Sequence, residues 1–195
     1  MPPQLANPAA WIEPTLRQAW ADFMVANHLV TFPLDDELHK GQPAYHAAMA
    51  KYQQALEKAL STLLLQFLPS RSDLVFVHCY LTDATIWNQA DVRRALLRVF
   101  QVNRHIGNLR LPLQAVERLV PDVQQAELDD SGRCIRLAEN AEYPYTDAQG
   151  NPVAPCDTFA TIFVQRFLNI QKNLSTLFKA LRSMPEFRYI LHDVE

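Results

Sequence analysis

Leu74-Val75-Phe76-Val77-His78-Cys79-Tyr80-Leu81 is the longest strand-like segment in the sequence. Six of its eight residues are aliphatic or aromatic, and the segment contains no Gly, Pro or acidic residue. Such a run is typical of a strand that is buried on both faces. An amphipathic helix is predicted to follow over residues 90–102, with Val92, Leu96 and Val99 on its apolar side. The segment 74–81 is therefore predicted to be the central strand of a small sheet.

Two long helices are predicted on either side of this strand. The first occupies residues 43–68, because Pro43 suits a first helical turn and Pro69 ends the pattern. The second occupies residues 157–183 and ends before Pro185. Both have apolar residues spaced by fours and threes, which favours a long helix–helix seam. The residues with this spacing are Tyr45, Met49, Tyr52, Leu56, Ala59, Leu63 and Phe67 in the first helix, and Phe163, Phe167, Ile170, Leu174, Leu177 and Leu181 in the second.

The remaining segments complete an α+β prediction. Residues 125–137 have the pattern of a hairpin with a Gly-containing turn, and the β-rich residues 187–194 are a candidate final strand. Residues 1–10 form a Pro-rich arm, and residues 140–156 a long polar loop. We expect a single helix-rich domain over residues 1–195, in which the two long helices pack on a sheet of three or four strands centred on 74–81.

Composition restricts the class of protein. With 49% hydrophobic and 20% charged residues, the chain can bury a core without disulfides. A net charge of −3 gives no overall attraction to nucleic acid or anionic membrane. The three cysteines are far apart, and neither a secretory signal nor an apolar run of membrane-spanning length is visible. We expect a soluble cytoplasmic protein with reduced thiols and no membrane partner.

An arginine-rich segment is the strongest local departure from average composition. Residues 92–116 contain five arginines and no acidic residue. Its candidate binding residues for a partner or an anion are Arg93, Arg94, Arg98, Arg104, His105 and Arg110. Guanidinium groups fork onto oxyanions, so the segment suits phosphate or the acidic surface of a partner. The alternative is a solvated helix face that pairs with Asp35, Asp36 and Glu37.

Evidence for a catalytic or metal site is weak. If residues 187–194 pair with 74–81, His78, Asp83 and His192 would gather at one end of the sheet. A core histidine and a helix-capping aspartate are the alternatives. No metal-ligand spacing, glycine-rich phosphate loop or GxSxG motif is present, so no metal and no cofactor is expected.

Three hypotheses for function follow. The first is a non-enzymatic interaction module, such as an adaptor, accessory subunit, chaperone or inhibitor, that docks a protein partner or forms a homo-oligomer through helical faces. The second is a nucleic-acid-binding subunit that uses the arginine-rich segment. The third is a small enzyme with its site at the C-terminal end of strand 74–81 and the loop 140–156 as a lid.

Overall fold

The computed structural model describes residues 5–32, 44–74, 89–99 and 164–191, together with four short strands between residues 127 and 153. The helical elements are η1 (Pro8–Trp11), α1 (Ile12–Thr31), α2 (Tyr45–Phe67), η2 (Pro69–Leu74), α4 (Ala90–Leu96) and α8 (Val164–Ser183). The strands are β1 (Glu127–Leu128), β2 (Cys134–Arg136), β3 (Tyr145–Thr146) and β4 (Pro152–Val153).

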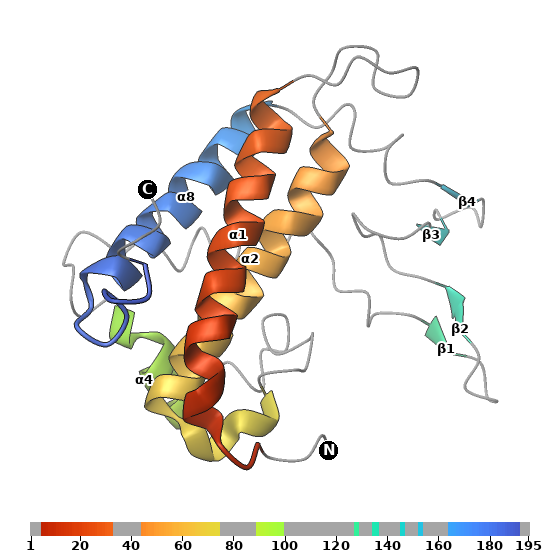
Figure 1. The fold of residues 1–195 in the computed structure, drawn as a ribbon. Helices are drawn as coiled ribbons and strands as arrows, with labels where there is room; N and C mark the ends of the chain where they lie inside the picture. Colours follow the sequence, from red (N-terminus) through yellow and green to blue (C-terminus); the bar gives the residue numbers. More distant parts are fainter. Residues whose placement is uncertain are drawn as a thin grey trace.

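Helices α1 and α2 lie side by side along most of their lengths and run in opposite directions (Figure 1). Helix α1 buries one stripe of its surface, with residues spaced by fours and threes. Helix α2 is more deeply enclosed, because every residue from Ala59 to Leu65 is buried. It can be enclosed in this way because these seven residues are apolar or small, and Thr62 donates a hydrogen bond to the Lys58 carbonyl at 2.9 Å.

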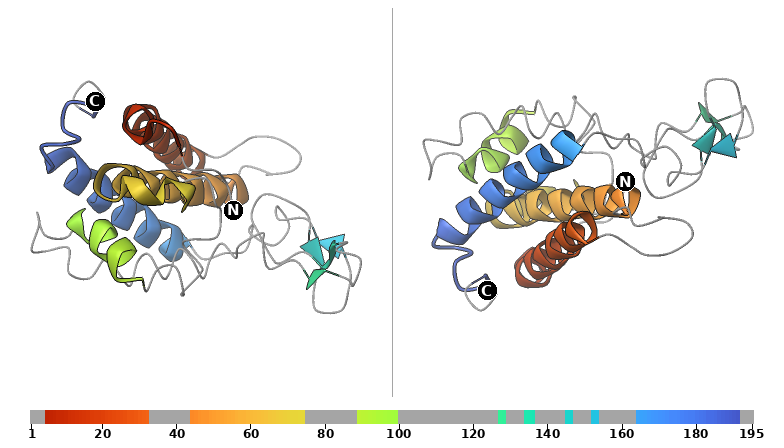
Figure 2. Two further views of the ribbon diagram at one scale, coloured as in Figure 1. Left: turned by 90° about the horizontal axis from the view of Figure 1, so that it is seen from below. Right: turned by 90° about the horizontal axis from the view of Figure 1, so that it is seen from above.

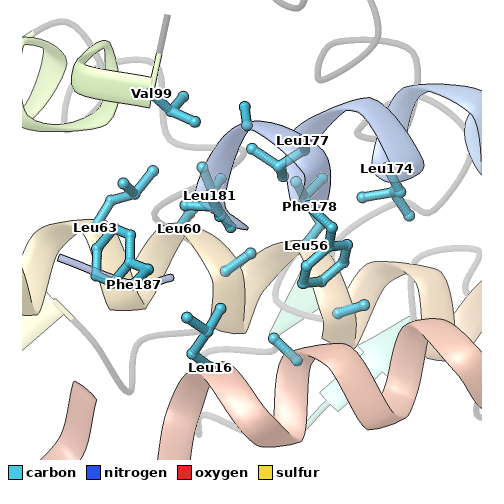
Figure 3. Close-up of a cluster of buried hydrophobic side chains, with 14 of the residues drawn as sticks. Leu16, Leu56, Leu60, Leu63, Val99, Leu174, Leu177, Phe178, Leu181 and Phe187 are labelled. Atoms are coloured by element: carbon cyan, nitrogen blue, oxygen red, sulfur yellow. The ribbon is translucent and has the colours of Figure 1, made fainter. Parts of the chain in front are cut away.

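The core forms where side chains of α1, α4 and α8 pack against α2 (Figure 3). Leu16 enters from α1, and Leu177 and Phe178 enter from α8. Val99, beyond the end of α4, closes the cluster. An aromatic group reinforces the junction of α1, α2 and α8, since the Phe23 ring lies 5.0 Å from Phe178 and 6.2 Å from Tyr52.

The prediction of an α+β fold is wrong, because the described body is all-α. The apolar stripes of the long helices pack against one another, and in the described residues no central sheet covers these stripes. Leu74, the first residue of the predicted central strand, ends the 3₁₀ helix η2 and is buried in the helical core. Residues 75–81 lie outside the described residues. A short apolar run does not by itself distinguish a strand from a buried helical segment.

The described strands are only two or three residues long and pair in two antiparallel ladders. Strand β1 pairs with β2, with Glu127 opposite Arg136, within the segment predicted to be a hairpin. Strand β3 pairs with β4 inside the predicted long loop. These ladders form two separate two-stranded sheets and do not provide the predicted sheet of three or four strands.

The predicted final strand is also corrected. Residues 184–191 form consecutive turns that follow α8, and residues 192–194 lie outside the described residues. Backbone hydrogen bonds from Phe187 to Met184 and from Ile190 to Phe187, each 3.0 Å long, hold these turns. The apolar residues that suggested a strand instead return to the helical core, where Phe187, Ile190 and Leu191 are buried. The predicted end of the second long helix at Ser183 is confirmed.

Candidate binding surface

The three described arginines of the arginine-rich segment lie on the outer side of α4 and the turn that follows it. Val92, Ala95 and Leu96 bury the inner side of this helix against the core. A helix that buries residues at this spacing turns the intervening residues toward solvent, and Arg93, Arg94 and Arg98 are exposed. The segment therefore presents at least three of its cations at the surface.

Arg71 holds the start of α4 in place. Its Nη1 donates a hydrogen bond of 2.6 Å to Oε1 of Gln89, the residue that precedes α4. Its Nε also lies 3.3 Å from Oδ1 of Asp73 in η2. One guanidinium thus links η2 to the residue that precedes α4.

Arg98 stacks on an aromatic pair that connects α4 to the C-terminal turns. Its guanidinium carbon lies 5.4 Å from the centre of the Phe67 ring, and this ring meets Phe187 edge-on at 6.1 Å. A cation over an aromatic face is held by the ring quadrupole without losing its charge. Arg98 is therefore a cation oriented by an aromatic ring, and no described residue forms an ion pair or hydrogen bond with its guanidinium.

The C-terminal turns add a second exposed cation and an exposed aromatic ring. Phe187 and Ile190 anchor the turns in the core, and the two residues between them face outward. Arg188 is exposed, and among the described residues Tyr189 is the most exposed large hydrophobic residue, at 62%. Because Phe187 touches the ring that carries Arg98, Arg188 lies at the same end of the helical body as α4.

Helix α8 extends this charged surface. Lys179 and Arg182 are exposed near its C-terminal end, which lies beside α4 in both figures (Figures 1 and 2). We call the resulting surface the basic end, and it consists of Arg93, Arg94, Arg98, Lys179, Arg182 and Arg188. Lys179, Arg182 and Arg188 were not among the predicted site residues. The spacing of seven residues between Lys172 and Lys179 predicts only that Lys179 lies on the polar side of its helix, and not that this helix ends beside α4.

The cations of the basic end lack the ion pairs that most other described Lys and Arg residues form with acidic side chains of the described residues. Elsewhere in the described residues, Arg17 pairs with Glu13, Arg71 pairs with Asp73, and two lysines pair with Asp22. Within the described residues, no cation of the basic end makes an ion pair. Asp91 and Glu186 are the acidic residues nearest in sequence among the described ranges, and they do not neutralise six cations.

Charge is also divided unevenly along the chain. The four helical ranges 5–32, 44–74, 89–99 and 164–191 carry twelve Lys and Arg against six Asp and Glu. The remainder carries six Lys and Arg against fifteen Asp and Glu. The four helical ranges therefore carry a charge of +6, although the net charge of the whole chain is −3. Local fields follow this distribution rather than the total.

Several predicted site residues cannot be compared with the structure. Arg104, His105 and Arg110 lie outside the described residues, as do the acids proposed to pair with the arginines, Asp35, Asp36 and Glu37. The possible enzymatic residues His78, Asp83 and His192 also lie outside them, and only β3 and β4 of the loop 140–156 are described. The enzyme hypothesis and its lid therefore stay predictions.

A second charged group lies between α1 and α2 and is buried. The Asp22 carboxylate, with a side chain only 4% exposed, pairs with Lys58 and, at 3.3 Å, with Lys51. Gln18 donates a hydrogen bond to it at 3.3 Å. Nearby, the Tyr52 hydroxyl donates to Oδ1 of Asn27 at 2.9 Å, and burial raises the pKa of this phenol well above its usual value. These contacts join the two helices and are enclosed by them, which is typical of a structural role.

Other kinds of site receive no support from the described part of the chain. Among its residues, no cluster of three or more His, Cys, Asp or Glu is arranged to hold a metal ion. None of its helices combines the length and apolar character needed to cross a membrane. Comparisons with protein-family models, curated proteins and solved structures give no match.

Proposed function

We propose that this protein is a non-enzymatic interaction module that binds the acidic surface of a protein partner through the basic end. The observation that carries the proposal is the group of six exposed cations on α4, α8 and the C-terminal turns, which have no ion-pair partner among the described residues. Complementary charge steers a partner during encounter and fixes its orientation.

The fold supports a charged binding surface better than the docking along apolar seams expected from the sequence. Leu56 and Leu63 of α2 and Leu177 of α8 belong to those seams, and all three are buried in the protein's own core. They are therefore not free to receive a partner helix. Binding through helical faces remains the proposed mechanism, but the faces are the outer sides of α4 and the end of α8.

The side chains of the basic end also suit specific recognition. Arginine and tyrosine dominate the energy of many protein interfaces, because they combine a large contact area with directed hydrogen bonds. Arg98 is already oriented by Phe67, so little conformational entropy is lost when it binds a carboxylate. Tyr189 supplies an exposed ring beside Arg188.

Single-stranded nucleic acid is a second candidate ligand, and Tyr189 is the observation that favours it. An exposed aromatic ring next to a cation can stack on a base while the cation contacts the phosphate. The protein partner is preferred because, among the described residues, Tyr189 is the one exposed aromatic ring shown beside the cations of the basic end, whereas single-strand binding usually uses several rings.

A direct binding assay tests the proposal with defined probes. The full-length protein is titrated into a fluorescently labelled 20-residue peptide rich in Glu and Asp, and into a labelled single-stranded 20-nucleotide DNA, at low and moderate salt. We expect the peptide to bind and to bind more weakly as salt rises. The double variant Arg94→Ala, Arg98→Ala is expected to bind about tenfold more weakly, since two surface charge contacts of about 0.7 kcal/mol each total about 1.4 kcal/mol.

The matched control is Arg17→Ala, which removes an exposed arginine of α1 outside the basic end. Its affinity for the peptide should remain within twofold of the wild-type value. Equal weakening in the control and in the double variant would contradict a specific basic end. Stronger, stacking-dependent binding of the DNA, reduced by Tyr189→Ala, would favour the second candidate, and binding of neither probe would reject both.

A further inference from the structure

The aromatic ring of Phe67 lies where three separate parts of the chain meet. Phe67 is the last residue of α2. Its ring is contacted by Arg98, which lies just beyond α4, and by Phe187 of the C-terminal turns. Both of these contacting segments carry cations of the basic end. The ring is therefore placed where it can decide how those cations are held.

The Phe67 ring is itself held in position. It is partly buried and packs against the hydrophobic core. The fully buried ring of Phe187 meets it edge-on, at an angle of 77° and a distance of 6.1 Å between ring centres. The last turn of α2 is also closed, because the amide of Leu68 donates a hydrogen bond of 2.8 Å to the Leu64 carbonyl. A ring held in this way can orient a further side chain that lies over it.

Arg98 is the side chain that this ring orients. Its neighbours Leu96 and Val99 are fully buried, which fixes the backbone on both sides of it. Its guanidinium carbon lies over the Phe67 ring, 5.4 Å from the ring centre. Within the described part of the chain, this ring is the group shown to hold the charged end of Arg98.

Arg94 provides a comparison on the same segment. It is exposed and carries the same charge, but no described residue forms an ion pair or a cation–π contact with it. An arginine that is free to rotate loses more conformational entropy on binding than one that is already oriented. The two arginines therefore differ in the entropy that each loses when it binds a carboxylate.

We infer that Phe67 is a positioning residue of the basic end, and that Arg98, which it orients, is the anchor for the acidic partner. The inference rests on the proposed function, because it names the residues that decide how strongly the basic end binds. In this role Phe67 acts through Arg98 rather than by touching the partner. A cation–π contact suits the role, since it orients the guanidinium without neutralising its charge.

The inference divides the loss expected of the double variant unevenly between the two arginines. Arg98→Ala should weaken binding of the Glu- and Asp-rich peptide about fivefold, and Arg94→Ala about twofold. Phe67→Leu removes the ring without changing any charge, and it should weaken binding about threefold because Arg98 is then no longer oriented.

A double-mutant cycle separates positioning from a merely structural role of Phe67. In the Arg98→Ala protein, Phe67→Leu should change the affinity by less than about 1.5-fold, because the side chain that it orients is gone. The matched control cycle combines Phe67→Leu with Arg94→Ala, and there the two losses should multiply. Phe67→Tyr keeps the ring and should restore binding to within about twofold of the wild-type value. Circular dichroism checks that each variant is folded before its affinity is measured.

NMR of the full-length wild-type protein tests the contact without any peptide. The Nε–H signal of Arg98 is assigned by its absence in Arg98→Ala. The ring current of Phe67 should shift this signal upfield of the corresponding signal of Arg94. An Arg98 signal at the same position as that of Arg94 would overturn the inference.

The outcomes of the binding experiment distinguish the inference from the proposed function. Peptide binding that Phe67→Leu leaves unchanged, or weakens equally with and without Arg98, would overturn the inference and leave the proposed function standing. A wild-type protein that does not bind the peptide would instead overturn the proposed function, and with it any role of Phe67 in binding.

Discussion

Replacing Asp22 with Asn should destabilise the protein by about 2 kcal/mol, because it removes the charge that neutralises Lys51 and Lys58. The carboxylate is buried between α1 and α2, whereas the two lysine side chains keep 38% and 33% of their surface exposed. The substitution retains the shape of the side chain, so the loss reports the charge contacts rather than a cavity.

The magnitude follows from this partial exposure. Breaking a fully buried ion pair leaves an uncompensated charge and costs about 3–5 kcal/mol. Here the remaining charges belong to lysines that can turn toward water, so each contact is reduced to about 1 kcal/mol. Two contacts give about 2 kcal/mol, which corresponds to a Tm lower by about 4–8 °C for a chain of this size.

Urea denaturation monitored by tryptophan fluorescence measures this difference, and Trp20 beside Phe23 provides a local signal. The matched control is Glu13→Gln, which breaks the exposed pair with Arg17 on the same helix. This pair has side chains more than half exposed, so its loss should cost at most about 0.5 kcal/mol. At 0.5 M NaCl the effect of the control should vanish, while that of Asp22→Asn should largely persist.

A free energy of unfolding for Asp22→Asn within 0.5 kcal/mol of the wild-type value would refute the reasoning. So would a loss that high salt abolishes, because salt screens exposed charges far more than buried ones.

Three further predictions concern buried and exposed side chains. Phe187→Ala should lower the free energy of unfolding, measured by urea denaturation, by about 3–5 kcal/mol, because the ring is fully buried. Tyr189→Ala, two residues later, should change it by less than about 0.5 kcal/mol, because this ring is 62% exposed. Tyr52→Phe should cost about 1 kcal/mol at pH 7 through the lost hydrogen bond to Asn27. The difference in free energy of unfolding between wild type and this variant should shrink above pH 10, by up to about 1.4 kcal/mol per pH unit. The reason is that the raised pKa keeps the native phenol protonated, whereas the unfolded phenol ionises and so favours unfolding of the wild type. A difference that does not change with pH would contradict this prediction. Arg98→Met should lower stability by about 0.5–1 kcal/mol, and no loss in thermal denaturation would show that stacking on Phe67 contributes nothing.

The helices were the predictable part of the fold. Apolar residues spaced by fours and threes, with prolines at the ends, predicted α2 within about two residues at its start, and predicted the end of α8. The same periodicity could not tell whether a seam faces a partner or the protein's own core. That depends on which helices meet, and Leu63 and Leu177 meet inside this chain.

The error in the C-terminal segment has a physical cause. Residues 187–191 are rich in aromatic and branched side chains, which is also the composition of a strand. Their burial pattern instead fits turns, because Phe187, Ile190 and Leu191 reach the core while Arg188 and Tyr189 face outward. Strand propensity depends on context, and tertiary packing decided the outcome here.

The candidate binding surface was predictable in part. Arg93, Arg94 and Arg98 were found because they are close together in sequence. Lys179 and Arg182 join them only because α8 ends beside α4, which is a tertiary relation that spacing along the chain does not encode. The same limit applies to Asp22, whose lysine partners are 29 and 36 residues away.

Mapping where an acidic ligand contacts the protein tests the central claim most directly. The isotopically labelled full-length protein is titrated with the Glu- and Asp-rich peptide, and backbone amide shifts are followed by NMR. The proposed function predicts that, among the described residues, the largest shifts fall in α4, the last turns of α8 and residues 184–191, and that they disappear in the Arg94→Ala, Arg98→Ala variant. Shifts centred on another part of the described helices, such as the exposed side of α1, would contradict the assignment of the basic end as the binding surface.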